Sequence, residues 1–184
     1  GSVPLGYSTV YDDQYTYFLS ETKEFEPCIK RIRNDLSGDP EILYEAEEIK
    51  GDGWSQYPMG CIFLWNEKIC FIEITKATEQ GNDEYEIHWL SKNGKENGTL
   101  VSYEQLNTYG DLLSQMEGAY FFNDYLIFGN RFFFYRLDLN TGELCRQEDF
   151  LDLEGPACFV AYNNGYYYYL IPDVEHNLMG ETLY

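Results

Sequence analysis

Basic residues are scarce in this chain of 184 residues, because 12 Lys and Arg stand against 32 Asp and Glu and leave a formal net charge of −20. A surface that binds phosphate groups needs clustered Lys and Arg, so the composition argues against nucleic acid as a partner. Anionic membrane surfaces are disfavoured for the same reason. A basic protein or an uncharged glycan remains compatible with this charge.

Long apolar runs are also missing, and none approaches the roughly 18 residues that a membrane-spanning helix needs. The longest ones, residues 125–128 and 132–135, have the length of strands. We therefore predict no membrane span. Disorder is disfavoured too, because 44% hydrophobic residues and 18% aromatic residues supply enough burial to offset the entropy of ordering. The length suits a single domain, which we place at residues 3–184.

The sequence lacks the motifs of nucleotide binding and of structural zinc sites, Gly-x-Gly-x-x-Gly and Cys-x-x-Cys among them. It contains two histidines. His88 alternates in a strand-like segment beside Trp89, with no triad pattern around it. His176 lies near Asp173 and Glu175, at a spacing that matches no zinc pattern. No pair of carboxylates is singled out for glycoside hydrolysis. We predict no catalytic residue, no metal and no cofactor.

Five cysteines cannot all pair within one chain, and Cys28, Cys61, Cys70 and Cys158 lie in or beside apolar segments where a free cysteine packs as a small hydrophobe. We predict no disulfide. Residues 1–2, Gly-Ser, are expected to be the scar of tag removal, so a missing signal peptide says nothing about the compartment. We expect an extracellular or cell-surface protein, and a cytoplasmic one stays open.

Two segments of the chain share one pattern. Residues 29–38 and 134–142 both run apolar, any residue, Arg, apolar, and then a polar turn that closes on Gly. Arg31 and Arg136, and the glycines that follow them, are separated by about 104 residues, so a further unit is expected about 52 residues along. Residues 68–74 and 84–90 provide two strand-like segments there.

Four aromatic or apolar segments each follow a polar turn and mark the start of a unit: residues 14–19, 68–74, 124–128 and 164–170. Tyr, Phe, Ile and Val favour a pleated sheet, and residues 84–89 alternate polar and apolar side chains with a period of two. The chain is therefore predicted to be all-β, in antiparallel four-stranded units. Their approximate ranges are 12–53, 54–107, 118–156 and 157–184, the last one completed by residues 3–11.

Two segments carry signals for helices. Ser102 and Gln105 match a capping box, which predicts one short helix near residues 102–116. Residues 39–51 begin with Asp-Pro-Glu and also satisfy the rules for a helix start. We favour a strand for them, because the copy of the pattern after Gly142 has no such start.

The four-stranded units resemble the blades of a β-propeller. Residues 28–38 and 133–142 resemble the repeats of low-density-lipoprotein-receptor-like propellers and of their bacterial relatives of unknown function. The likeness spans most of residues 7–172, although the chain lacks the Tyr-Trp-Thr-Asp motif of the receptor repeats. At about 52 residues per unit the chain holds about three and a half units, fewer than the roughly four to eight blades of most closed propellers. A small ring, a fragment and an open assembly of sheets stay open.

The resemblance implies a non-catalytic binding or scaffolding domain of a bacterial exported or surface protein. The charge suggests as an alternative an acidic interaction protein, such as an immunity protein that neutralises a basic toxin, because opposite charges speed association. A carbohydrate-binding module is the third hypothesis. The candidate partner-binding side chains are aromatic residues that could form one platform, unless they pack between blades. They are Trp54, Tyr57, Tyr162, Tyr166 and Tyr168.

Overall fold

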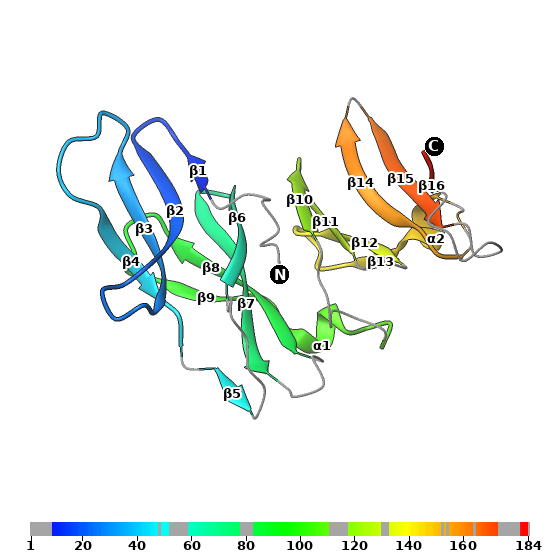
Figure 1. The fold of residues 1–184 in the computed structure, drawn as a ribbon, viewed down its shortest axis with the longest axis horizontal. Coiled ribbons are helices and arrows are strands. Elements are labelled where there is room, and N and C mark those ends of the chain that lie inside the picture. The colour runs from blue at the N-terminus through cyan, green and yellow to red at the C-terminus, as the bar shows by residue number, and fades with distance from the viewer. Residues whose placement is uncertain are drawn as a thin grey trace. The chain divides into compact units, whose positions relative to one another are not determined.

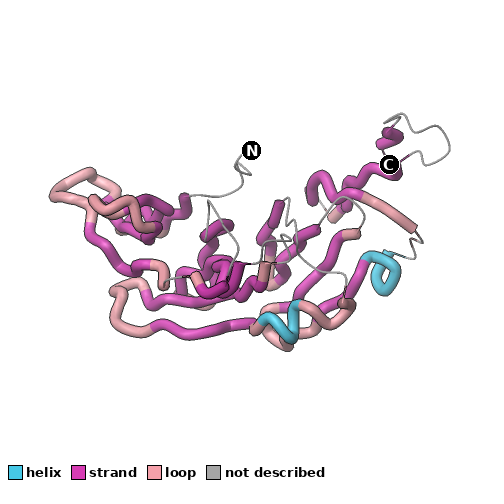
Figure 2. The backbone as a smooth tube through the Cα atoms, turned by 60° about the horizontal axis from the view of Figure 1, so that its bottom comes forward, coloured by secondary structure: helices cyan, strands magenta, loops and turns pink. Residues whose placement is uncertain are grey.

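The computed structural model confirms the all-β class, with two short helices instead of one (Figures 1 and 2). It describes residues 9–47, 49–51, 59–77, 83–110, 118–129, 133–151, 153, 155–163, 165–172 and 181–183. The chain divides into two compact units, residues 1–114 and 115–184, which we describe separately.

The first sheet of the first unit is a meander in which each strand pairs antiparallel with the next along the chain. Its strands are β1 (Thr9–Tyr11), β2 (Tyr15–Glu21), β3 (Pro27–Arg33) and β4 (Glu41–Glu45). The strand β4 confirms the strand interpretation of residues 39–51, since pairing with β3 satisfies the backbone that a helix start would otherwise have used. Residues 9–11 of the last predicted unit pair with β2, within this first sheet.

The second sheet contains β6 (Met59–Trp65), β7 (Lys68–Ala77), β8 (Glu84–Ser91) and β9 (Asn97–Val101), again paired in chain order, and β5 (Lys50–Gly51) lies parallel to β7. A helix, α1 (Tyr103–Leu106), follows β9. The Ser102 amide donates to Gln105 Oε1 at 3.0 Å, as the capping box predicts. The helix is shorter than the predicted range, and residues 111–117 lie outside the part described.

The second unit begins with a third meander: β10 (Gly118–Phe122), β11 (Tyr125–Gly129), β12 (Phe134–Asp138) and β13 (Leu144–Arg146). The helix α2 (Gln147–Leu151) comes next, followed by the sheet of β14 (Cys158–Asn163), β15 (Tyr166–Pro172) and β16 (Glu181–Leu183). The sequence did not lead us to α2. Its first residue, Gln147, is fully buried, where its side chain accepts from the Phe134 amide and donates to the Gly155 carbonyl.

The core of the first unit lies between its two sheets. It consists of fully buried side chains from both: Tyr17 and Ile29 from the first sheet, and Ile62, Ile69, Phe71 and Leu90 from the second. The run of apolar residues in β7 is buried on both of its faces, which explains why this strand does not alternate in polarity.

Within the same unit, burial raises the pKa of the Cys70 thiol to about 12, so the thiol remains protonated.

The core of the second unit is aromatic. Ile127, Phe134 and Ala157 are fully buried, and Phe150, Tyr167 and Tyr169 pack against them. The Phe134 and Phe150 rings meet edge to face at 5.9 Å between centroids, an arrangement that favours the aromatic quadrupoles. Part of the tyrosine excess is therefore used in packing.

The turn between β8 and β9 approaches the first sheet closely at Gly94, where both the positive φ and the nearby Leu43 backbone disfavour a side chain. Gly94 has a φ of +72°, and a Cβ there would lie 3.0 Å from the Leu43 carbonyl oxygen. Gly38 has a φ of +81°, and a Cβ there would meet no atom within 4 Å.

We expect Gly38→Ala to lower the free energy of unfolding by about 1 kcal/mol and Gly94→Ala by about 2–3 kcal/mol. Urea unfolding measures both. Equal losses would contradict the close approach.

Candidate functional site: bridging arginines and a buried acid–histidine cluster

Arg31, on β3, connects the two sheets of the first unit. Its guanidinium carbon lies 4.5 Å from the centroid of the Tyr15 ring. Nε and Nη2 donate to Glu41 Oε2 at 2.9 and 2.7 Å, and Nη1 donates to the Lys92 carbonyl oxygen, in the β8–β9 turn, at 2.7 Å. The Arg31 side chain is only 18% exposed, but the Glu41 side chain is 63% exposed, so water screens the bonds to Glu41 more than the partly buried bond to the Lys92 carbonyl.

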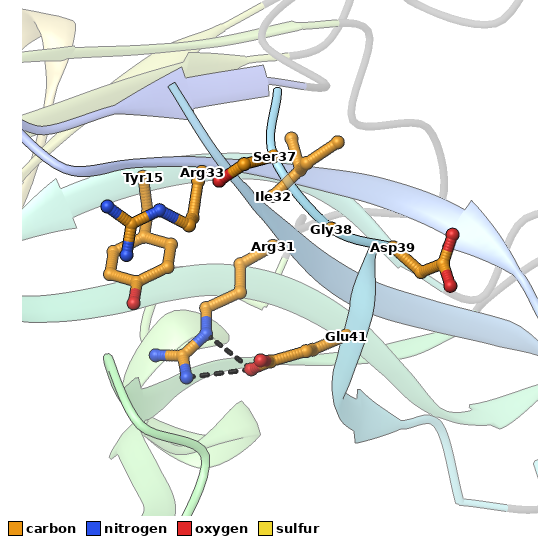
Figure 3. A pocket seen from close by; sticks show the side chains of 8 residues that line it. All are labelled: Tyr15, Arg31, Ile32, Arg33, Ser37, Gly38, Asp39 and Glu41. Atoms are coloured by element: carbon orange, nitrogen blue, oxygen red, sulfur yellow. Dashed lines mark hydrogen bonds and ion pairs between the residues drawn. The ribbon is translucent and has the colours of Figure 1, made fainter. Parts of the chain in front are cut away.

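A surface pocket of about 390 Å³ lies beside Arg31 (Figure 3). It is lined by Tyr15, Arg31, Ile32, Arg33, Ser37, Gly38, Asp39 and Glu41. In Figure 3 the Glu41 carboxylate faces Arg31, while the Asp39 carboxylate points away from it. The pocket has a second arginine, Arg33, whose Nε lies 3.5 Å from Asp35 Oδ1. Because carboxylates offset both guanidinium charges, the pocket does not have the chemistry of an anion site.

Arg136, on β12, has the corresponding place in the second unit. Its guanidinium carbon lies 5.1 Å from the centroid of the Tyr125 ring and 4.5 Å from that of Phe150. Burial alone would lower the pKa of Arg136. The hydrogen bond with Tyr167, on β15, opposes this effect, and the net result is a raised pKa. In both sheets the arginine of the sequence pattern therefore stacks on a tyrosine that starts the second strand, and bonds to the following sheet. We call Arg31 and Arg136 the bridging arginines.

A buried carboxylate marks the second feature of the first unit. Glu73, on β7, is only 3% exposed. Its Oε2 accepts from the Tyr44 hydroxyl at 2.8 Å and lies 3.7 Å from His88 Nδ1. Its Oε1 is buried, with no hydrogen-bond partner among the residues that the structure describes. The sequence signal for this residue, which we did not use, is a single charge inside the apolar run of β7.

The cluster continues from Glu73 through His88 to the edge of the sheet. His88 Nε2 lies 3.1 Å from Glu86 Oε2, which also accepts from Thr99 Oγ1 at 3.2 Å. The His88 ring lies 5.8 Å from that of Phe71. Both imidazole nitrogens thus face carboxylates, and the neighbouring hydroxyl is already a donor to one of them. Among the described residues this arrangement joins β7, β8 and β9, and carboxylates lie next to both imidazole nitrogens.

Burial raises the pKa of Glu73, against the opposing effects of the Tyr44 hydrogen bond and of His88. Glu47 acts on this pKa in both directions, because its negative charge raises it and a hydrogen bond from its backbone lowers it. In the described ranges no group of three or more His, Cys, Asp or Glu side chains is placed to hold a metal ion. The cluster is best understood as a polar contact between β4, β7 and β8.

The aromatic residues that the sequence suggested do not all meet. Trp54 and Tyr57 lie outside the described residues, as does His176. Tyr166 is 69% exposed, and Tyr168, two residues along β15 and thus on the same face, is half-buried. In the pairing of β14 with β15, Tyr162 lies opposite Tyr167, whereas the residue opposite Tyr168 is Ala161. The structure therefore brings two of the five candidates onto one face.

Comparison with known proteins adds no assignment, because no protein-family model and no curated protein matches the chain. Among the residues described, neither helix has the length and apolar character to cross a membrane. Function must therefore be inferred from the sheets, their connecting contacts and the surface that they expose.

Replacing Arg31 tests its bridging role. We expect Arg31→Lys to lower the free energy of unfolding by about 1–3 kcal/mol, because a lysine ammonium cannot keep the fork of bonds to Glu41 and Lys92 while stacking on Tyr15. Arg33→Lys is the matched control, since the Arg33 side chain is 60% exposed, and should change stability by less than about 0.5 kcal/mol. Urea unfolding of both variants gives the comparison, and equal effects would refute the bridge.

The raised pKa of Glu73 makes stability depend on pH. A carboxyl group whose pKa is raised by folding stabilises the fold below its ordinary pKa of about 4.3, and this contribution is lost as the pH rises through the folded value. We expect Glu73→Gln to unfold at a higher temperature than the parent at pH 8, with a difference that shrinks toward pH 4. Thermal melts across this range measure it.

Glu45→Gln removes the same charge at an exposed position and serves as the control. A pH dependence identical in the parent, Glu45→Gln and Glu73→Gln would show that burial of Glu73 does not affect the stability.

Proposed function

We propose that this chain is a non-catalytic binding or scaffolding domain, built from repeated four-stranded β-meanders in a propeller-like manner. The observation that carries the proposal is the shared plan of three described sheets, β1–β4, β6–β9 and β10–β13, in which every strand pairs with the next one along the chain. A blade of a propeller is a meander of this kind. The assignment to a bacterial exported or surface protein rests on the resemblance of the sequence.

The turns support one repeated unit. The third and fourth strands of each of these sheets are joined by a turn that contains a glycine with positive φ: Gly38 (81°), Gly94 (72°) and Gly142 (74°). Asn66 and Asn123, which follow the first strand of two of the sheets, have φ values of 46° and 44°. Equivalent turn chemistry at equivalent positions is what repetition of one structural unit predicts.

The bridging arginines support the same conclusion. Arg31 reaches the β8–β9 turn of the next sheet, and Arg136 reaches Tyr167 of the next sheet in its own unit. The polar groups buried in the first unit, Glu73 and its neighbours, likewise join strands. Because these groups serve assembly, we place the function on the outer surface of the sheets and their loops.

The charge favours a protein partner that is basic. A net charge of −20 attracts cationic surfaces over about a Debye length and speeds their association. An immunity protein that neutralises a basic toxin is one form of this function. A carbohydrate-binding module is the second candidate, favoured by the exposed Tyr166 and the half-buried Tyr168 on one face of β15.

Two screens of the intact chain separate these candidates. We expect a displayed library of random peptides to yield binders that combine Lys or Arg with apolar residues, and we expect a glycan array to yield none. A second acidic protein screened in parallel removes the peptides that bind any polyanion. Glycan hits without enriched peptides would contradict the proposal and favour the carbohydrate-binding module.

A further inference from the structure

One type of turn is found in three of the described connections between strands of the first unit, with different residues at the position that favours glycine. In the β8–β9 turn the Gly94 amide donates to the Ser91 carbonyl at 2.8 Å, and Gly94 has a φ of 72°. In the β2–β3 loop the Phe25 amide donates to the Thr22 carbonyl at 3.2 Å, and Phe25 has a φ of 65°. A bulky side chain in this left-handed region is strained.

The third such turn follows β3. There the Leu36 amide donates to the Arg33 carbonyl at 2.8 Å, and Leu36 has a φ of 57°. Burial does not compensate for the strain at either apolar residue, because Phe25 is 81% exposed and Leu36 is 73% exposed. Phe25 and Leu36 thus adopt a backbone conformation that suits glycine, and their side chains do not stabilise the fold by burial. Such an uncompensated strain is typical of positions that serve function.

The loop around Phe25 is firmly built. The Thr22 amide donates to the Glu26 carbonyl at 2.8 Å, and Thr22 Oγ1 accepts from the Glu24 and Glu26 amides, both at 3.2 Å. Four hydrogen bonds within five residues, counting that of Phe25, fix the backbone of the loop, and the Phe25 side chain on it is exposed. A loop whose backbone is already ordered loses less entropy on binding, which favours an aromatic anchor on it.

The charges around Phe25 indicate what it can meet. Glu21, Glu24 and Glu26 are exposed neighbours of Phe25 in the sequence, together with Lys23. Lys30 adds a second positive charge to the loop, since its Nζ donates to the Glu21 carbonyl at 2.6 Å. The carboxylates still outnumber the ammonium groups, which disfavours an anionic lipid surface and a second copy of the same loop. The complementary surface is an apolar pocket with Lys and Arg at its rim.

We propose that the β2–β3 loop is an interaction site, in which Phe25 inserts into an apolar pocket of a basic partner protein and Glu21, Glu24 and Glu26 pair with the rim of that pocket. This inference rests on the proposed protein-binding function and names the partner chemistry. Leu36 shares the positive φ and the exposure of Phe25 but carries an aliphatic side chain, and its acidic neighbour Asp35 is paired with Arg33 Nε at 3.5 Å. It therefore provides the control for strain and exposure without the aromatic ring.

The first test needs no partner. Asparagine tolerates the left-handed region better than phenylalanine or leucine does. We therefore expect Phe25→Asn and Leu36→Asn to unfold at a urea concentration equal to or higher than that of the parent. A lower midpoint for Phe25→Asn would show that the ring supports the fold, and would overturn the proposal.

The second test uses synthetic copies of the peptides enriched on the intact parent chain. We expect them to bind Phe25→Asn at least tenfold more weakly than the parent and to bind Leu36→Asn within twofold of it. Replacing Glu24 and Glu26 together with Gln should weaken binding and reduce its dependence on salt.

Three outcomes would count against the site. Peptides that bind Phe25→Asn as tightly as the parent would overturn the assignment of the loop, while the protein-binding function would stand. The loop would also be ruled out if the double Gln variant bound as tightly as the parent and with the same salt dependence. Failure to enrich any peptide would overturn the proposed function and this inference together.

Discussion

The contact between Arg31 and the β8–β9 turn is the constraint on which the first unit depends. A guanidinium group has to satisfy its donors when it leaves water, and here Tyr15, Glu41 and the Lys92 carbonyl surround it. The absence of a side chain at Gly94 allows this close approach without displacing the Leu43 backbone, which would lie 3.0 Å from a Cβ. Two meanders that carry no local signal for each other are thereby fixed face to face, and the apolar core forms between them.

The same interface contains a second polar connection, through Asp12. Burial alone would raise its pKa, but bonds from the Gln14 and Tyr15 amides and from Lys92 hold the pKa of Asp12 well below its usual range. Lys92 also reaches Glu67, at 2.7 Å. At neutral pH this site is therefore ionised and paired, whereas Glu73 keeps a buried oxygen without a partner in the described part of the chain. The interface is stabilised by well-satisfied charges in one place and carries an electrostatic penalty in another.

Assembly through polar contacts has a consequence for function. When arginines, a histidine and buried acids are occupied with one another, recognition has to come from exposed loops. In the proposed function, the acidic surface attracts a basic protein over a long range, which sets the rate of encounter more than the final affinity. Specificity then requires an apolar anchor, and the exposed Phe25 of the β2–β3 loop is the one that we propose. Charge would set the rate of association, and the anchor would set the specificity.

The sequence alone determined the local structure: alternating and aromatic segments gave strands, Asn and Gly gave turns, and Ser102 with Gln105 gave the start of a helix. These features depend on neighbouring residues only. Tertiary structure decided the rest. It brought Arg31 to the Lys92 carbonyl, 61 residues along the chain. It also placed the buried Glu73 against the Tyr44 hydroxyl, and it connected Gln147, the first residue of α2, to the Phe134 amide. Such contacts form between distant segments, and no local pattern encodes which segments meet, because burial and hydrogen-bond satisfaction are properties of the assembled sheets.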